Sequence, residues 1–221
     1  MTGNMPKDGV QVARKIGYCG REEKMVESTI YTIGYRGFDI DDFIVVLLDH
    51  QVNILIDVRS KPYCKHHPWY DKPTLEETMK KVGIDYQNYI HEFGGRQEDE
   101  CLYDETGVIS YEAFAASKQF QSGVEKVRRH LSKGNTITFM CAEEEPLECH
   151  RAIMVARAFH ESGYPVIHLL PGHREKTHSE LEMELVKNFP DSQCETNGNV
   201  RMCLETAYRS QNQKIGYKRQ P

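Results

Sequence analysis

The stretch Asn53-Ile-Leu-Ile-Asp-Val58 decides the fold class of this chain. It is a continuous apolar run with a single acid near its end. A strand with one face in water alternates apolar and polar residues, whereas a continuous apolar run is typical of a strand that is covered on both faces. The stretch therefore predicts a central strand of a parallel sheet.

Strand-like and helix-like segments alternate on both sides of this run. Short β-branched and apolar runs predict strands, and apolar residues at helical spacing predict the helices between them. The expected strands are 30–33, 53–58, 84–90, 136–140 and 165–170. The expected helices are 39–50, 74–82, 110–121, 123–131 and 146–162. The alternation predicts a three-layer, Rossmann-like α/β fold with a mostly parallel sheet and helices on both faces.

Particular residues set the expected helix ends. Thr74 with Glu77 three residues later predicts a capping box that opens the second helix. Pro146 is expected at the first position of the last helix, because proline suits that position. Gly163 is expected just past the end of the same helix.

Composition limits the classes of function. The chain has 221 residues, of which 39% are hydrophobic and 28% charged, and its net charge is -5. This describes a folded, soluble protein, without the roughly 20-residue apolar run of a membrane span. The negative charge argues against a broad electrostatic grip on nucleic acid and leaves a local basic patch open. Seven cysteines without a disulfide-like spacing, and no secretory signal, predict a cytoplasmic location.

The chain is expected to contain one domain between two extensions. Residues 1–24 are rich in glycine and lack periodicity, so an irregular or disordered extension that folding does not need is expected there. A single α/β domain is expected over 25–191. Residues 192–221 are polar and predict a C-terminal tail.

The candidate site lies where the predicted strands end. Right-handed crossovers bring the carboxyl ends of parallel strands to one edge, which is where α/β proteins bind ligands. The segment Phe139-Met-Cys-Ala-Glu-Glu-Glu-Pro-Leu-Glu-Cys-His-Arg151 places two thiols, an imidazole, a guanidinium and several carboxylates at that edge. Glu143 and Asp57 are the acids expected to act in catalysis. The expected ligand-binding residues are Arg59, Arg151, Tyr35, Ser60 and His150.

The two cysteines of this segment have different expected roles. Cys141 ends a strand before a helix and is a candidate nucleophile, although the neighbouring glutamates would raise the pKa of its thiol. Cys149 falls on an apolar helical stripe with Ala152 and Phe159, so it is expected to be a structural core residue. A zinc site from Cys141, Glu143, Cys149 and His150 has suitable ligand types. The spacing fits none of the usual zinc motifs, so no metal and no cofactor is expected.

An aromatic and basic loop follows the strand at 53–58. Tyr63, Trp69 and Tyr70, together with Tyr35, are of a kind that stacks on a base or another planar ligand. Lys61, with the lysine and two histidines that follow, makes the loop locally basic and offers a contact for an anion. The alternative is a solvated loop with aromatic residues at the edge of the core.

Several of these motifs resemble one family. The motifs are Ile30-Tyr-Thr-Ile-Gly-Tyr35, Leu55-Ile-Asp-Val-Arg-Ser60 with Pro62, Tyr86 after a Gly-Ile pair, Gly94-Gly95, Cys141-Ala-Glu143 with Cys149-His-Arg151, and Ile215-Gly-Tyr217. They are similar to the bacterial domain of unknown function family 488, from about Ile30 to about Asp191. The resemblance implies a Rossmann-like fold and implies little chemistry.

Three functional hypotheses follow. The first is a protein that binds or processes a nucleotide, a nucleoside or another small anionic metabolite through the strand-end Asp, Arg and Glu residues. The second is a thiol enzyme using Cys141, since the layout is similar to rhodanese sulfurtransferases. The third is a non-catalytic module that binds nucleic acid or protein. The first is preferred, because an acidic loop does not suit the anion cradle of a rhodanese.

Overall fold

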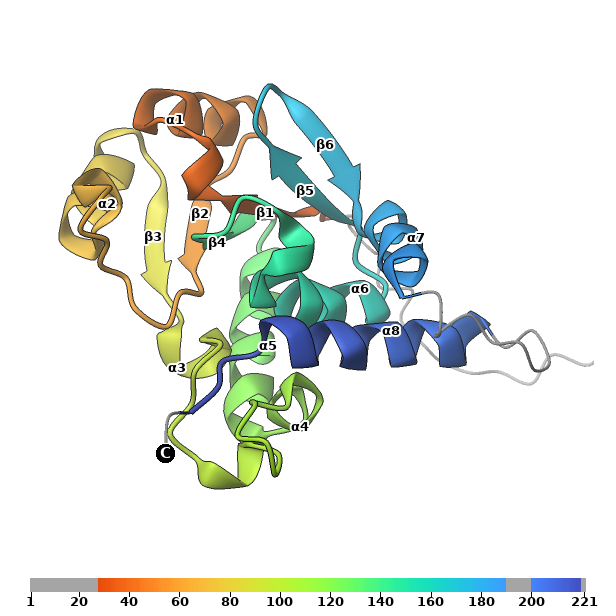
Figure 1. Ribbon diagram of the computed structural model, residues 1–221. Helices are drawn as coiled ribbons and strands as arrows, with labels where there is room; N and C mark the ends of the chain where they lie inside the picture. Colours follow the sequence, from red (N-terminus) through yellow and green to blue (C-terminus); the bar gives the residue numbers. More distant parts are fainter. Residues whose placement is uncertain (1–27, 190–199, 220–221) are drawn as a thin grey trace, which may run out of the picture.

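The computed structural model describes residues 28–189 and 200–219 as a six-stranded sheet with helices packed on it (Figure 1). The extension expected over 1–24, and the domain boundary at 25, lie outside the described residues. The strands are β1 (Ile30–Gly34), β2 (Ile54–Asp57), β3 (Asp85–Asn88), β4 (Ile137–Cys141), β5 (Val166–Leu170) and β6 (Arg174–Thr177). Their order across the sheet is β3-β2-β4-β1-β5-β6.

The predicted parallel sheet is confirmed. Ile54 lies opposite Ile137 in a parallel register, so β2 pairs with β4 as the sequence predicted. Strand β1 pairs in parallel with β4 and with β5. Only β6, which the sequence analysis missed, is antiparallel among the strands of the described chain, and it forms an edge against β5. The carboxyl ends of β2, β4 and β1 therefore lie side by side at the centre of one edge.

Helices cover both faces of this sheet (Figure 1). The helices are α1 (Ile40–Asp49), α2 (Lys72–Lys81), α3 (Ile90–Phe93), α4 (Tyr111–Ala115), α5 (Lys118–Leu131), α6 (Arg157–Glu161), α7 (His178–Asn188) and α8 (Val200–Ile215). Helices α1 and α2 pack with Leu55 and Met140 in one core. The other helices enclose a second core that contains Ile56 and Phe139. Among the helices of the described residues, none is both long and apolar enough to cross a membrane.

Two predicted helix boundaries are wrong, for local reasons. Helix α2 begins at Lys72, not at Thr74, because Pro73 is well suited to the first turn. Thr74 lies inside the helix, where its carbonyl accepts a hydrogen bond from the Thr78 hydroxyl. The break expected near residue 122 lies instead at Ser117, whose hydroxyl accepts from the Phe120 amide and caps α5.

The helix expected over 146–162 is divided into three pieces. A 3₁₀ turn, η4 (Pro146–Glu148), is followed by extended backbone at Cys149, with φ -138° and ψ 135°. A π-helix, η5 (Arg151–Ala156), then leads directly into α6. The positive φ of Gly163, 89°, ends the segment as expected. The interruption at Cys149 matters for the site, because it changes the direction in which that side chain points.

The predicted polar tail contains helix α8, which packs on α7 and on the core. Ala207 and Tyr208 of α8 are buried. The Gln211 side chain donates a hydrogen bond to the Leu147 carbonyl at 2.7 Å. After α8 the chain runs beside residues 107–109, where Ile109 donates to the Tyr217 carbonyl. This segment is therefore part of the domain.

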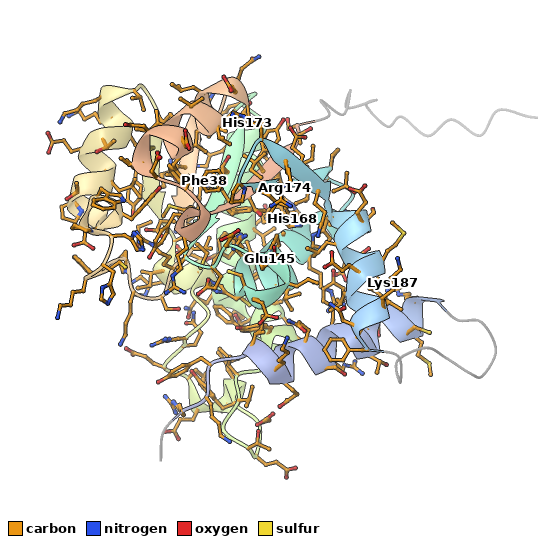
Figure 2. All side chains as sticks on the ribbon, turned by 45° about the horizontal axis from the view of Figure 1, so that its top comes forward. Phe38, Glu145, His168, His173, Arg174 and Lys187 are labelled. Carbon is orange, nitrogen blue, oxygen red and sulfur yellow. The ribbon has the colours of Figure 1, made fainter. Side chains whose placement is uncertain are left out.

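A buried chain of hydrogen bonds connects β1, β5, α7 and α8. His168 Nδ1 lies 2.7 Å from the Thr32 hydroxyl, and His168 Nε2 lies 3.0 Å from His178 Nδ1. His178 Nε2 lies 2.9 Å from the Tyr208 hydroxyl, which donates to Glu182. With one proton on each imidazole, every donor in the chain meets an acceptor. His168 of β5, which Figure 2 labels, is fully buried.

The folded protein is expected to lose stability in acid through these two histidines. Burial, together with the charges of His160 and Arg157, lowers the pKa of His178 to about 3. Burial, with the neighbouring His178, Arg151, Lys176 and His160, also lowers the pKa of His168 well below its usual value. From about pH 6.5 down to about pH 3, the unfolded chain therefore binds protons that the folded chain does not.

The expected result is a free energy of unfolding that falls with pH over this window. Each histidine contributes a slope of about 1.4 kcal/mol per pH unit. His178→Gln should remove one such contribution, as measured by urea unfolding at a series of pH values. His66→Gln is the control, since His66 is exposed. An unchanged slope in His178→Gln would contradict the prediction.

Candidate functional site

A cavity of about 280 Å³ opens at the carboxyl edge of β1, β2 and β4. Six of the predicted site residues line it: Tyr35, Arg59, Ser60, Cys141, Glu143 and His150. They come from three strand ends that neighbour one another in the sheet, which is why residues more than 100 positions apart meet. Asp57 and Arg151, the other two predicted residues, do not line this cavity.

Arg59 is held by Asp57 at the end of β2. Arg59 Nη2 lies 2.6 Å from Asp57 Oδ2, and Arg59 Nε donates to both carboxylate oxygens at 2.9 and 3.0 Å. The Tyr86 hydroxyl of β3 donates to Asp57 Oδ2 at 2.6 Å. Asp57 is fully buried, and Arg59 is 3% exposed. The remaining nitrogen, Arg59 Nη1, is buried without a hydrogen-bond partner.

This geometry gives Asp57 a different role from the one expected. The carboxylate lies behind the guanidinium, and the guanidinium and the Tyr86 hydroxyl occupy its oxygens. It is therefore not placed to meet a ligand in the cavity. Its contact with Arg59 holds the guanidinium in one orientation and keeps it charged. The sequence could not distinguish this from catalysis, because both roles call for an acid at a strand end.

Tyr35 forms the wall beside Arg59. The centre of its ring lies 4.4 Å from that of Tyr70, in a stacked arrangement, and 5.3 Å from the Arg59 guanidinium carbon. Burial raises the pKa of Tyr35 to about 12, so its hydroxyl stays protonated. A hydrogen bond with Tyr35 lowers the pKa of the Cys64 thiol, which also lines the cavity.

The predicted aromatic loop divides into two parts. Tyr63 lines the cavity and is 66% exposed, so it is open to contact with a ligand. Trp69 does not line the cavity, and Tyr70 is fully buried beneath Tyr35. Lys61 lines the cavity, as do Arg36 and Arg96. The loop therefore supplies one aromatic ring and part of a positively charged wall.

Two thiols, a carboxylate and an imidazole meet on the floor of the cavity. Glu143 Oε2 lies 3.0 Å from Cys141 Sγ and 3.0 Å from Cys149 Sγ. His150 Nδ1 lies 3.9 Å from Cys141 Sγ. The other nitrogen of this ring, Nε2, lies 2.8 Å from the Val58 carbonyl oxygen. Figure 2 shows the next part of this loop, around Glu145, at the same edge of the sheet.

The protonation of these groups is interdependent. Burial raises the pKa of the Cys141 thiol. Burial acts in the same direction on Cys149, but a hydrogen bond from Cys141 and the charges of Arg151 and His150 outweigh it and lower the pKa of Cys149. Burial would lower the pKa of His150, but contact with Cys149 raises it. Burial also raises the pKa of Glu143.

Cys149 is a buried core residue, as the sequence predicted, but it also lines the cavity. Its side chain is buried, at 1% exposure, as expected. The backbone at Cys149 is extended and not helical, so the thiol contacts Glu143 while the residue stays in the same core cluster as Ala152 and Phe159. Cys149 and His150, which should point in different directions on a helix, thereby reach the same site.

Arg151 holds the loop that carries Glu143. Its side chain is fully buried, and it donates from Nη1 to the Glu143 carbonyl and from Nη2 to the Glu144 carbonyl at 2.9 Å. The loop also lies against Gly34, where a Cβ atom would be only 1.8 Å from the Glu143 carbonyl oxygen. Arg151 therefore positions the loop from behind.

These contacts weigh against a rhodanese-like site. A cradle for an anionic thiol ligand presents backbone N–H groups. Here two carbonyls of the loop after Cys141 are turned to Arg151. The raised pKa of Cys141 also makes it a poor nucleophile. Of the two buried thiols, Cys149 has the stronger thiolate character.

Other cavity residues were not among those predicted. Arg96 follows the Gly94-Gly95 pair, its amide donates to the Ser60 hydroxyl at 3.0 Å, and its guanidinium carbon lies 4.5 Å from the Tyr217 ring centre. Tyr217 comes from the segment after α8. Arg96 comes directly after the motif Gly94-Gly95 that the sequence analysis recorded, and Tyr217 belongs to the recorded motif Ile215-Gly-Tyr217. Their proximity to Arg59 is decided only by tertiary structure.

The fold and the cavity define an α/β protein with a candidate site at the carboxyl edge of a mostly parallel sheet. The chain belongs to the family described as Domain of unknown function DUF488, which matches residues 39–158, more than half of its 221 residues. This confirms the family that the motifs indicated. The matched range contains Asp57–Ser60 and the whole of Cys141–Arg151. Neither the curated proteins nor the solved structures contain a match.

Gly34→Ala is expected to destabilise the fold strongly. The added methyl group would overlap the Glu143 backbone carbonyl, which Arg151 holds in place, so the loop must move. Overpacking of this kind costs about 3 kcal/mol or more. Chemical denaturation measures the loss.

Gly134→Ala is the matched control for this substitution. Gly134 has a φ of 80°, and a Cβ atom there would meet nothing within 4 Å. Only backbone strain is added, which costs about 1 kcal/mol. Equal losses in the two variants would show that the close approach at Gly34 is unimportant.

Proposed function

We propose that this protein binds and processes a small anionic metabolite, such as a nucleoside monophosphate, in the cavity at the carboxyl edge of the sheet. The observation that carries the proposal is Arg59 Nη1, a buried guanidinium nitrogen without a hydrogen-bond partner, on a side chain that lines the cavity. A buried donor of this kind favours a ligand that brings an acceptor, and a phosphate or carboxylate suits the planar guanidinium fork.

The charge of the cavity wall supports an anion. Four cationic side chains, Arg36, Arg59, Lys61 and Arg96, line it with two carboxylates, Glu143 and Glu148. Glu148 is paired with Lys214 at 2.7 Å, and Glu143 is turned to the two thiols. The wall around Arg59 is therefore positive, although the whole chain carries a net charge of -5.

The size and lining of the cavity favour a compact ligand. Its volume of about 280 Å³ is near the lower end of the range for small-molecule sites. Tyr35, Tyr63 and Tyr217 give it aromatic surface, which suits a planar group such as a base. In this arrangement Arg59 binds the anionic group, and Glu143 is the acid that acts on the bound ligand. The fully buried Asp57 orients Arg59.

A reducing, cytoplasmic compartment suits this site. The thiols of Cys64, Cys141 and Cys149 all line the cavity. The pKa values of the Cys64 and Cys149 thiols are lowered, which would make these thiols prone to oxidation in an oxidising compartment. We include this location in the proposal.

Inorganic phosphate and AMP are expected to raise the melting temperature of the wild-type protein. A ligand at about 100 times its Kd stabilises the folded state by about 2.7 kcal/mol. For a chain of this size the shift is about 5 to 10 °C. Adenosine, which lacks the anionic group, should give a much smaller shift. Differential scanning fluorimetry measures all three.

Arg59→Gln should abolish the phosphate shift, and Arg209→Gln should retain it. Arg209 is exposed and paired with Glu112, away from the cavity. Arg59→Lys separates binding from folding, because the ammonium still neutralises Asp57 but has no second nitrogen to turn toward the cavity. This variant should fold and lose most of the shift. A full phosphate shift in both Arg59 variants, or none in the wild type with any anion, would refute the proposal.

A further inference from the structure

Four potential metal ligands converge on the floor of the cavity. One ligand atom each from Cys141, Glu143, Cys149 and His150 lies within 4.8 Å of the other three. The contacts from Glu143 Oε2 to the two sulfurs are 3.0 Å each, and that from Cys141 Sγ to His150 Nδ1 is 3.9 Å. With zinc bonds of about 2.0 to 2.3 Å, the ligand atoms of a tetrahedral site lie about 3.3 to 3.8 Å apart. The separations of the cluster, from 3.0 Å to at most 4.8 Å, span this range, so shifts of about 1 Å would bring the four atoms to zinc distances.

The imidazole of His150 is oriented as a metal ligand. A carbonyl oxygen only accepts hydrogen bonds, so the 2.8 Å contact with Val58 places the ring proton on Nε2. Nδ1 then presents its lone pair to the cluster. Histidines that bind a metal commonly donate their other N–H to a carbonyl or carboxylate in this way. Gly95 packs against the ring, where a Cβ atom would lie 2.9 Å from His150 Cγ.

The surroundings of Cys149 suit a metal-bound thiolate. The Arg151 amide donates to Cys149 Sγ at 3.4 Å. Hydrogen bonds to ligating sulfurs tune metal–thiolate sites. The side chain of Arg151 is fully buried next to the same loop and adds one positive charge.

The charges of the cluster balance around a divalent cation. Two thiolates and one carboxylate carry three negative charges, and Arg151 contributes one positive charge. A divalent ion supplies the remaining two, so these buried groups become neutral together. Soft sulfur ligands with an imidazole in a tetrahedral arrangement select zinc over magnesium or calcium.

We propose that the chain binds a Zn²⁺ ion through Cys141, Cys149 and His150, with Glu143 as the fourth ligand on the cavity side. The spacing that argued against a metal in the sequence is explained by the fold. Strand β4 supplies Cys141, and the change from extended to helical backbone after Cys149 lets two consecutive residues point to one place. With four protein ligands the ion has no open position, so Glu143 must leave the ion before it can act on a bound ligand or before the ion can act as a Lewis acid.

The zinc site stands independently of anion binding. Arg59 is not a ligand of the ion in this arrangement, so Arg59→Gln should retain the metal even if it loses phosphate. Conversely, the increase in melting temperature on adding phosphate depends on Arg59 and not on the thiols. Failure of one proposal is therefore distinguishable from failure of the other.

The experiment is metal analysis of the full chain after expression with added zinc and gel filtration without chelator. The wild type is expected to carry about one zinc ion per chain. Cys149→Ala and Cys141→Ala should each lose it, whereas Cys101→Ala, an exposed thiol outside the cavity, should keep it. Circular dichroism confirms that each variant is folded. Zinc at wild-type stoichiometry in both cavity-cysteine variants, or no stoichiometric zinc in the wild type, would overturn the proposal.

Cobalt substitution tests the ligands without relying on a variant that folds. Wild-type protein reconstituted with Co²⁺ should show thiolate-to-cobalt charge-transfer absorption together with the visible bands of a tetrahedral ion. A spectrum of six-coordinate cobalt without charge transfer would refute thiolate ligation. Gly95→Ala, which keeps all four ligands but crowds the His150 ring, should bind zinc about 10- to 100-fold more weakly. Unchanged affinity in that variant would argue against His150 as a ligand.

Discussion

The buried guanidinium of Arg151 is the constraint on which the site depends. A cation removed from water is costly unless it is neutralised and hydrogen-bonded. Arg151 donates to the carbonyls of Glu143 and Glu144 and so fixes the backbone of the loop after β4. Gly34 permits the loop to lie directly on β1. With its carbonyls turned to Arg151, the loop directs the Glu143 side chain to the two thiols.

A second constraint of the same kind fixes Arg59 on the other side of the cavity. Asp57 accepts hydrogen bonds from one edge of the Arg59 guanidinium, and the Tyr86 hydroxyl donates to the same carboxylate. The remaining nitrogen, Nη1, is buried without a hydrogen-bond partner, on a side chain that lines the cavity. In both cases a buried charged residue that does not line the cavity, Asp57 or Arg151, holds a residue that does line it, Arg59 or Glu143. This division explains why two of the predicted site residues do not line the cavity.

Much of the fold could be predicted from local patterns, and the exceptions have physical reasons. The continuous apolar run at β2 is required in a strand covered on both faces, so its parallel pairing followed directly. Strand β6 and helix α8 were missed because they are largely polar. Tyr208 of α8 is buried through its bond to His178, an interaction between elements 30 residues apart that no local pattern records. The predicted helix start at Thr74 is wrong because α2 already begins at Lys72, with Pro73 in its first turn.

For the site, the sequence by itself determined which groups gather at one edge, because parallel strands bring their carboxyl ends together. That placed Tyr35, Arg59, Ser60, Cys141, Glu143 and His150 in the right neighbourhood. Only the tertiary structure decided which of the groups at that edge face the cavity. Asp57 turned away because a buried acid pairs with the nearest cation. Cys149 turned inward because a 3₁₀ turn, an extended residue and a π-helix replaced the regular helix that its spacing implied.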